Sequence, residues 1–152
     1  MTELVERAER ALNQLIKDIE ALVRSESPSS DLDALRRSAD LVTDIGTRYL
    51  GVGPERIEID GRPHLAWRLG RGPRRVIILA HHDTVWPIGS WGEDPWSFTD
   101  GVIRGPGCFD MITGILQAML GIQLLAADGV DLDGVTLLVT PTRRSVRRAH
   151  GR

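Results

Sequence analysis

Two residues whose types suit metal chemistry, His81 and Asp83, directly follow an apolar run at residues 76–80. In extended backbone both side chains point the same way, so the carboxylate can hold the second ring nitrogen of a metal-bound imidazole. Asp110, at the start of an apolar helical pattern, offers the hard oxygen ligands that zinc accepts together with imidazole. The pattern predicts a metal site at the end of a buried strand, where open α/β sheets place their chemistry.

Each of these residues also has a simpler interpretation. A His-x-Asp pair by itself is more often a surface pair than a metal site. Asp110 by itself would serve as a helix N-cap, stabilised by the helix dipole and the free N–H groups. The metal interpretation is favoured by the combination of strand, His-x-Asp, a long loop and Gly105-Pro106-Gly107 before Asp110.

Hydrophobic periodicity and turn signals give the elements that would position these residues. In chain order we expect a helix at about 3–24 capped by Thr2, a break at residues 25–30 and a helix from about 30 to 50. Strands at 56–59 and 64–69 follow, joined by a hairpin turn at Asp60-Gly61. The expected elements after them are a strand at 76–80, a loop at 86–107, a helix at 111–127 and a strand at 135–139. The run at 76–80 shows no alternation, which predicts a central strand covered on both faces. The last two strands and the helix between them predict a right-handed βαβ unit.

Composition and length set the bounds for these expectations. With 152 residues, of which 41% are hydrophobic, the chain suits a single domain. No run approaches eighteen apolar residues, so we expect no membrane span, and the first residues lack a signal-peptide pattern. A single cysteine, Cys108, excludes an internal disulfide framework and predicts a cytoplasmic location.

Two stretches, residues 79–87 and 104–111, resemble motifs of the zinc exopeptidase family. That family includes carboxypeptidase G (glutamate carboxypeptidase), acetylornithine deacetylase, succinyl-diaminopimelate desuccinylase and aminoacylase. The resemblance extends over about residues 3–142, and Trp86-Pro87 favours the glutamate carboxypeptidase branch. It implies an α/β fold, the N-terminal part of a mixed, mostly parallel sheet flanked by helices, from an incomplete catalytic domain.

The resemblance also implies roles for individual residues. His81 would bind one zinc, Asp83 would be the catalytic carboxylate that orients it, and Asp110 would bridge two zincs. His82 and Cys108 stand at variable family positions, so we expect a non-ligand and a small buried residue. His64 is expected to be an ordinary strand residue, and substrate-binding residues are not identified. The family's usual Lys-Gly-Gly or Lys-Ala-Gly is replaced here by Ile-Thr-Gly at residues 112–114.

The chain departs from the family after Pro141. The family continues with Glu-Glu, a general base followed by a zinc ligand, whereas this chain has Arg143 and Arg144. A guanidinium stays protonated and can fill neither role. A family-like stretch Thr-Pro-Asp-Glu-Glu-Val-Gly-Ser-Pro-Ser-Ser-Arg, written in suitable codons, translates as residues 140–151 of this chain once a single base is deleted. We therefore expect a truncated catalytic part at 1–142 and an out-of-frame Arg-rich tail at 143–152.

The truncation has functional consequences. The resemblance implies a dizinc metallopeptidase or amidohydrolase that cleaves an amide next to a free carboxylate in small peptides or N-acyl amino acids. This chain would lack later zinc ligands and the dimerisation domain, bind zinc weakly at most, and be inactive. Its strand faces would lie bare, which favours aggregation.

The alternative is a non-enzymatic binding or regulatory module that acts through the basic tail or an intact paralogue. We do not expect a nucleic-acid partner, because the body is acidic and the tail has no interleaved aromatic residues.

Overall fold

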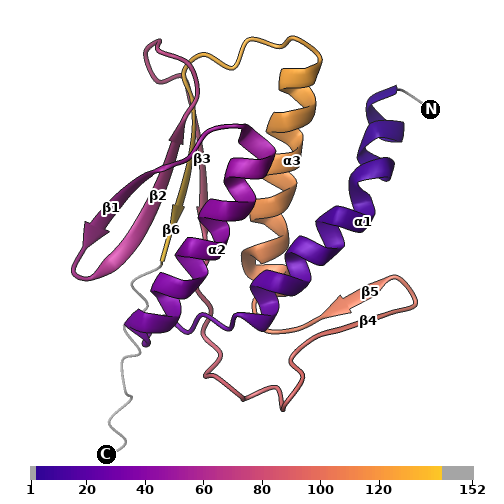
Figure 1. Cartoon of the computed structure of the whole chain (residues 1–152), viewed down its shortest axis with the longest axis vertical. Helices are drawn as coiled ribbons and strands as arrows, with labels where there is room; N and C mark the ends of the chain where they lie inside the picture. Colours follow the sequence, from indigo (N-terminus) through magenta and orange to yellow (C-terminus); the bar gives the residue numbers. More distant parts are fainter. Residues whose placement is uncertain (1–2, 142–152) are drawn as a thin grey trace, which may run out of the picture.

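The computed structural model describes residues 3–141, in which helices cover one side of a four-stranded mixed sheet (Figure 1). Its elements are α1 (Glu3–Arg24), α2 (Leu32–Leu50), β1 (Glu55–Ile59), β2 (Arg62–Arg68), β3 (Val76–His81), β4 (Ser97–Thr99), β5 (Val102–Arg104), η1 (Cys108–Ile112), α3 (Thr113–Ala127) and β6 (Val135–Thr140). This α/β arrangement confirms the predicted fold class. Thr2 and the Arg-rich tail lie outside the described residues.

The first two helices form where the apolar periodicity predicts them. α1 has the expected bounds, and it buries an apolar stripe that includes Leu15, Ile19 and Leu22. α2 begins at Leu32 rather than near residue 30, because the Asp31 side chain accepts the backbone N–H groups of the first turn as an N-cap. Gly51, with a φ of 72°, ends it in the left-handed conformation that glycine adopts without strain.

The sheet has the strand order β1-β2-β6-β3. β1 and β2 form the predicted hairpin around Asp60-Gly61, and β2 pairs antiparallel with β6. β3 and β6 pair in parallel across α3, which confirms the βαβ connection. This is the one parallel pairing among the described strands, so this part of the sheet is mixed without being mostly parallel.

The prediction that β3 is covered on both faces is wrong for the described residues. β3 is an edge strand, and its Ile77 and Leu79 side chains are 58% and 65% exposed. They project from the face opposite the helices, whereas β6, next to β3, buries Leu137 and Val139 completely. The apolar run correctly indicates a strand suited to two covered faces, but residues 3–141 cover only one of them.

The stretch 86–107 is not the continuous loop that we expected. It contains the antiparallel hairpin β4–β5, which turns at Asp100-Gly101 with φ values of 52° and 76°. Aspartate followed by glycine is a strong hairpin signal, and the same pair correctly located the β1–β2 turn. The short strands, each of three residues, lack the length of apolar alternation that would identify them.

The helix after this hairpin starts later than predicted. A π-helical turn, η1, precedes α3, and Asp110 and Met111 within it have non-helical backbone angles. The segment Cys108–Ala127 is apolar and long enough to cross a membrane by length and composition alone. We expected no such segment, because no run of eighteen consecutive apolar residues occurs in the sequence. Ile115, Leu116 and Met119 are fully buried in the core, so α3 packs as the central helix of the α/β layer.

Gly46 marks the closest approach of α2 to the sheet. A Cβ added there would overlap the Trp67 ring and lie 2.9 Å from Cε of Met119. Both neighbours are fully buried and have little room to move. We therefore expect Gly46→Ala to lower the free energy of unfolding by about 1–3 kcal/mol, measured by urea denaturation.

Gly121→Ala in α3 is the matched control, because nothing lies within 4 Å of its added Cβ. In that open helical position alanine should stabilise the protein by about 0.4–1 kcal/mol, since it restricts the unfolded chain. Equal effects of the two substitutions would contradict the close packing of α2 on Trp67.

Candidate metal centre at the end of β3

His81 is the last residue of β3, and both of its ring nitrogens face oxygen atoms. Nδ1 lies 3.0 Å from the backbone oxygen of Asp83 and 3.2 Å from Asp83 Oδ1. Nε2 lies 3.1 Å from Asp110 Oδ1. Carbonyl and carboxylate oxygens both accept, so a proton on Nδ1 meets Asp83 and a proton on Nε2 meets Asp110. Only the tautomer with its proton on Nδ1 leaves the Nε2 lone pair to a metal.

The three sequence-predicted residues come from different elements and meet in one place. Asp83 follows β3 and is buried, while Asp110 is carried by η1 and its side chain is 61% exposed. Gly107 permits η1 to approach, because a Cβ there would lie 2.5 Å from Cγ2 of Thr84. Asp110 does not cap α3, which begins at Thr113 without a side-chain cap. The geometry therefore does not support the helix-cap interpretation.

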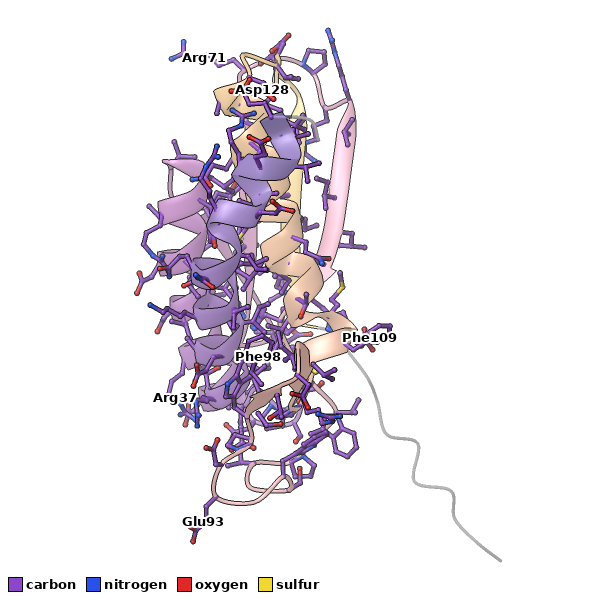
Figure 2. All side chains as sticks on the ribbon, turned by 90° about the vertical axis from the view of Figure 1, so that its right-hand side faces the viewer. Arg37, Arg71, Glu93, Phe98, Phe109 and Asp128 are labelled. Carbon is purple, nitrogen blue, oxygen red and sulfur yellow. The ribbon has the colours of Figure 1, made fainter. Side chains whose placement is uncertain are left out.

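A cavity of about 270 Å³ opens beside these residues. Its lining includes His81, Asp83 and Asp110 together with Trp86 and Trp91. The two rings pack edge to face, with centroids 5.4 Å apart. Phe109, next to Asp110, is 96% exposed and points away from the ribbon (Figure 2). The cavity thus combines polar lining residues with two partly exposed tryptophans.

His82 points away from the cavity into the core, between β2 and α2. Its Nδ1 lies 3.1 Å from Ser38 Oγ and its Nε2 lies 3.4 Å from the Pro63 carbonyl oxygen. Burial lowers the pKa of His82 from 6.5 to about 4, so the ring is neutral near neutral pH. His82 is therefore a core residue. His64 is a half-buried residue of β2, and Cys108 is half-buried against the core.

The donor atoms present suit part of a zinc coordination sphere. An imidazole nitrogen and a carboxylate oxygen 3.1 Å apart at the edge of a cavity are ligands of the types that zinc accepts. Within residues 3–141 no group of three or more His, Cys, Asp or Glu side chains is arranged to hold a metal ion. Because a zinc site takes about four ligands, His81 and Asp110 supply at most half of one.

Sequence reasoning missed the connection between α1 and α2, where the serine-rich segment at 25–30 was interpreted only as a helix break. Ser29 Oγ donates a hydrogen bond to Asp83 Oδ2, and Ser27 Oγ donates one to the His82 carbonyl oxygen at 2.6 Å. Ser27 is 1% exposed. The available signal was Ser-Pro-Ser between two amphipathic helices, which marks a turn but says nothing about its tertiary partner.

Comparison with known proteins shows which solved structures share this fold. No family model matches the chain. Over 95 residues the chain is 36% identical to the uncharacterized protein YgeY of Escherichia coli strain K12, a match that covers 60% of this chain and 23% of YgeY. Human carnosine dipeptidase 1 superposes with a TM-score of 0.76 and 18% identity, covering 97% of this chain and 36% of that one.

Two further solved structures agree with this result. An M20 family metallo-carboxypeptidase, Sso-CP2 from Sulfolobus solfataricus, gives a TM-score of 0.67 at 18% identity and covers 92% of this chain and 30% of its own. The di-peptidase Dug1p from Saccharomyces cerevisiae gives 0.69 at 15% identity, covering 90% and 33%. The chain therefore has the fold of a portion of such peptidases and spans about a third of their length.

Proposed function

We propose that this chain is part of a zinc-dependent hydrolase that cleaves an amide bond next to a free carboxylate, in the manner of a glutamate carboxypeptidase. The observation that carries the proposal is the approach of His81 Nε2 to Asp110 Oδ1 at the end of β3, with Asp83 behind Nδ1. The peptidase-like fold supports it. The chain by itself is expected to be inactive.

In this proposal His81 and Asp110 hold metal, and Asp83 is the catalytic carboxylate that orients His81. When bound, zinc polarises the substrate carbonyl and activates water as a Lewis acid. Among this chain's own residues, Asp83 keeps the imidazole in the tautomer that leaves Nε2 free. Trp86 and Trp91 offer apolar surface to a small peptide or N-acyl amino acid in the cavity.

The sheet register supports the proposed shift of reading frame after Pro141. His81 pairs with Thr140 in the parallel β3–β6 ladder, and the His82 N–H donates to the Thr140 carbonyl oxygen. The carboxyl ends of β3 and β6 therefore lie side by side. Two glutamates placed two and three residues after Pro141 would leave β6 next to His81, where a general base and a further ligand are needed.

The exposed apolar face of β3 supports the proposal that this chain is part of a larger catalytic domain. Ile77 and Leu79 expose apolar surface next to the site, on a strand that pairs along one edge only within residues 3–141. Such a face and edge suit further strands and helices of the same catalytic domain. As a whole, the proposal is for a cytoplasmic hydrolase whose catalytic domain includes residues 1–142.

Zinc titration of the 152-residue chain tests the proposed ligands. We expect weak binding by calorimetry, and we expect His81→Ala and Asp110→Ala each to lower the zinc affinity at least about tenfold. The reason is that each variant removes one of the two donors that face each other. Hydrolysis of N-acyl amino acids by the zinc-loaded chain should not exceed that of His81→Ala.

His64→Ala is the matched control for this titration, because His64 lies in β2 away from the cavity lining. Its zinc affinity should equal that of the unsubstituted chain. A loss of affinity in His64→Ala as large as in His81→Ala would instead mean that zinc binds histidines indiscriminately, and the proposed centre would have to be abandoned.

A further inference from the structure

The connection between α1 and α2 is bonded to the segment that carries the candidate metal ligand. It joins the two helices at the end of the molecule where β3 finishes (Figure 1). The Thr84 N–H donates to the Ser27 carbonyl oxygen at 2.8 Å, and the Ser29 N–H donates to the Thr84 carbonyl oxygen at 2.9 Å. Pro28 and Thr84 thereby form an isolated parallel bridge that extends the pairing of the segment beyond β3.

Side chains strengthen this attachment. Ser27 Oγ donates to the His82 carbonyl oxygen at 2.6 Å, and Ser29 Oγ lies within reach of two acceptors, Asp83 Oδ2 and the Thr84 carbonyl oxygen. A carboxylate is the stronger acceptor of the two, because hydrogen bonds to ionised groups are shorter and roughly twice as strong. The Ser29 proton is therefore directed to Asp83.

Asp83 connects Ser29 to His81 through its two oxygen atoms. Oδ2 accepts from Ser29, and Oδ1 faces Nδ1 of His81 at 3.2 Å. The carboxylate is buried, so loss of a donor to one oxygen costs free energy unless the carboxylate rotates to a new partner. Rotation would move Oδ1 away from Nδ1, and the imidazole would keep only the Asp83 backbone oxygen, 3.0 Å away, as an acceptor at that nitrogen.

We propose that Ser29 is a positioning residue of the metal centre, which acts by holding the Asp83 carboxylate in the orientation that fixes the His81 imidazole. This inference rests on the proposed function for its purpose, but the geometry that it describes exists without metal. The effect passes from a hydroxyl in the helix connection, through a buried carboxylate, to the ring whose Nε2 faces Asp110.

The test uses Ser29→Ala, the hydroxyl-retaining Ser29→Thr, and Ser27→Ala as a control from the same connection. Long-range ¹H–¹⁵N NMR of the metal-free chain at pH 8 reports which His81 nitrogen is protonated. We expect the fraction of the Nδ1–H form to be highest in the unsubstituted chain, to fall in Ser29→Ala and to recover in Ser29→Thr. Zinc affinity should fall about tenfold in Ser29→Ala and recover in Ser29→Thr.

Ser27→Ala removes a hydrogen bond to a backbone carbonyl of the same segment, so its stability should fall while the His81 tautomer stays as it is. The inference is overturned if Ser29→Ala keeps the Nδ1–H fraction of the unsubstituted chain, or if Ser27→Ala lowers that fraction as much as Ser29→Ala does. Failure of the proposed function gives a different pattern: zinc affinity is then unaffected by His81→Ala, while the tautomer results stand.

Discussion

Restoring one base directly after the codon of Pro141 is expected to convert an inactive chain into an amide hydrolase. The restored frame should place Glu-Glu two and three residues beyond Pro141, at the edge of the sheet where β6 ends beside His81. We expect hydrolysis of N-acyl amino acids or small peptides with a free carboxylate, at least about 10³-fold above the His81→Ala form of the same protein. The expectation follows because a metal centre and a general base each contribute several kcal/mol to the barrier.

Site variants in the restored protein identify the roles of individual residues. Asp110→Ala and His81→Ala should abolish measurable turnover, because each removes a proposed ligand. Changing the first restored glutamate to glutamine should lower kcat and leave zinc content unchanged, since glutamine cannot act as a base. His64→Ala, in β2, should retain full activity.

The locus should be sequenced before this experiment, because its nucleotide sequence decides whether the proposed frameshift exists. If the phase adjacent to Thr142 does not encode Glu-Glu-Val-Gly, the tail belongs to the original reading frame and the proposed shift is refuted. If the frame is restored and turnover equals that of its His81→Ala form, the proposed hydrolase function fails even though the fold is retained.

The parts of the fold that could be predicted are those specified by local patterns. The periodicity of α1 and the Asp60-Gly61 turn each give a strong signal within a short window, and both were located correctly. β3 was correctly predicted as a strand, but the prediction that it is a central strand covered on both faces was wrong for the described residues. An apolar run without alternation indicates a strand that can pack against other elements on both faces. Residues 3–141 cover only one face of β3.

In the candidate site, too, the contacts between residues close in sequence could be predicted, whereas those that depend on tertiary packing could not. The spacing of His81 and Asp83 indicated two side chains on one face, and the structure places Oδ1 next to Nδ1. Asp110 could be added only through its motif, because its approach to His81 depends on Gly107 and η1. Ser29 could not be predicted, since its partner Asp83 is remote in sequence and the contact depends on how the helices pack on the sheet.

Acidification is expected to destabilise the protein through His82. A buried ring with a folded-state pKa of about 4 stays mostly neutral as the pH falls from 6.5 toward 4, whereas the same residue in the unfolded chain takes up a proton. Stability from this group is therefore complete above pH 6.5 and is lost as the pH falls toward 4. The loss at the low end is about 3 kcal/mol, a large part of the stability of a small domain.

The contacts of His82 explain why the charged form is excluded. The Pro63 carbonyl oxygen only accepts, so Nε2 carries the proton and Nδ1 accepts from Ser38 Oγ. A second proton on Nδ1 would turn that acceptor into a donor in a site that is almost fully buried. Protonation thus costs both the Ser38 hydrogen bond, unless the hydroxyl rotates, and the desolvation of a charge.

Urea denaturation between pH 4 and pH 8, in EDTA to remove metal, measures this dependence. His82→Asn keeps a polar side chain near Ser38 without a group that titrates in this range. It should be less stable than the original chain at pH 8, and its stability should fall less steeply between pH 6.5 and pH 4. His64→Gln removes a histidine whose charge makes a smaller contribution than burial to the lowered pKa of His82, so it should change the slope much less than His82→Asn does. If His82→Asn and the original chain lose stability in parallel, the acid sensitivity arises from other groups, because the single buried imidazole would then make no difference to proton uptake on unfolding.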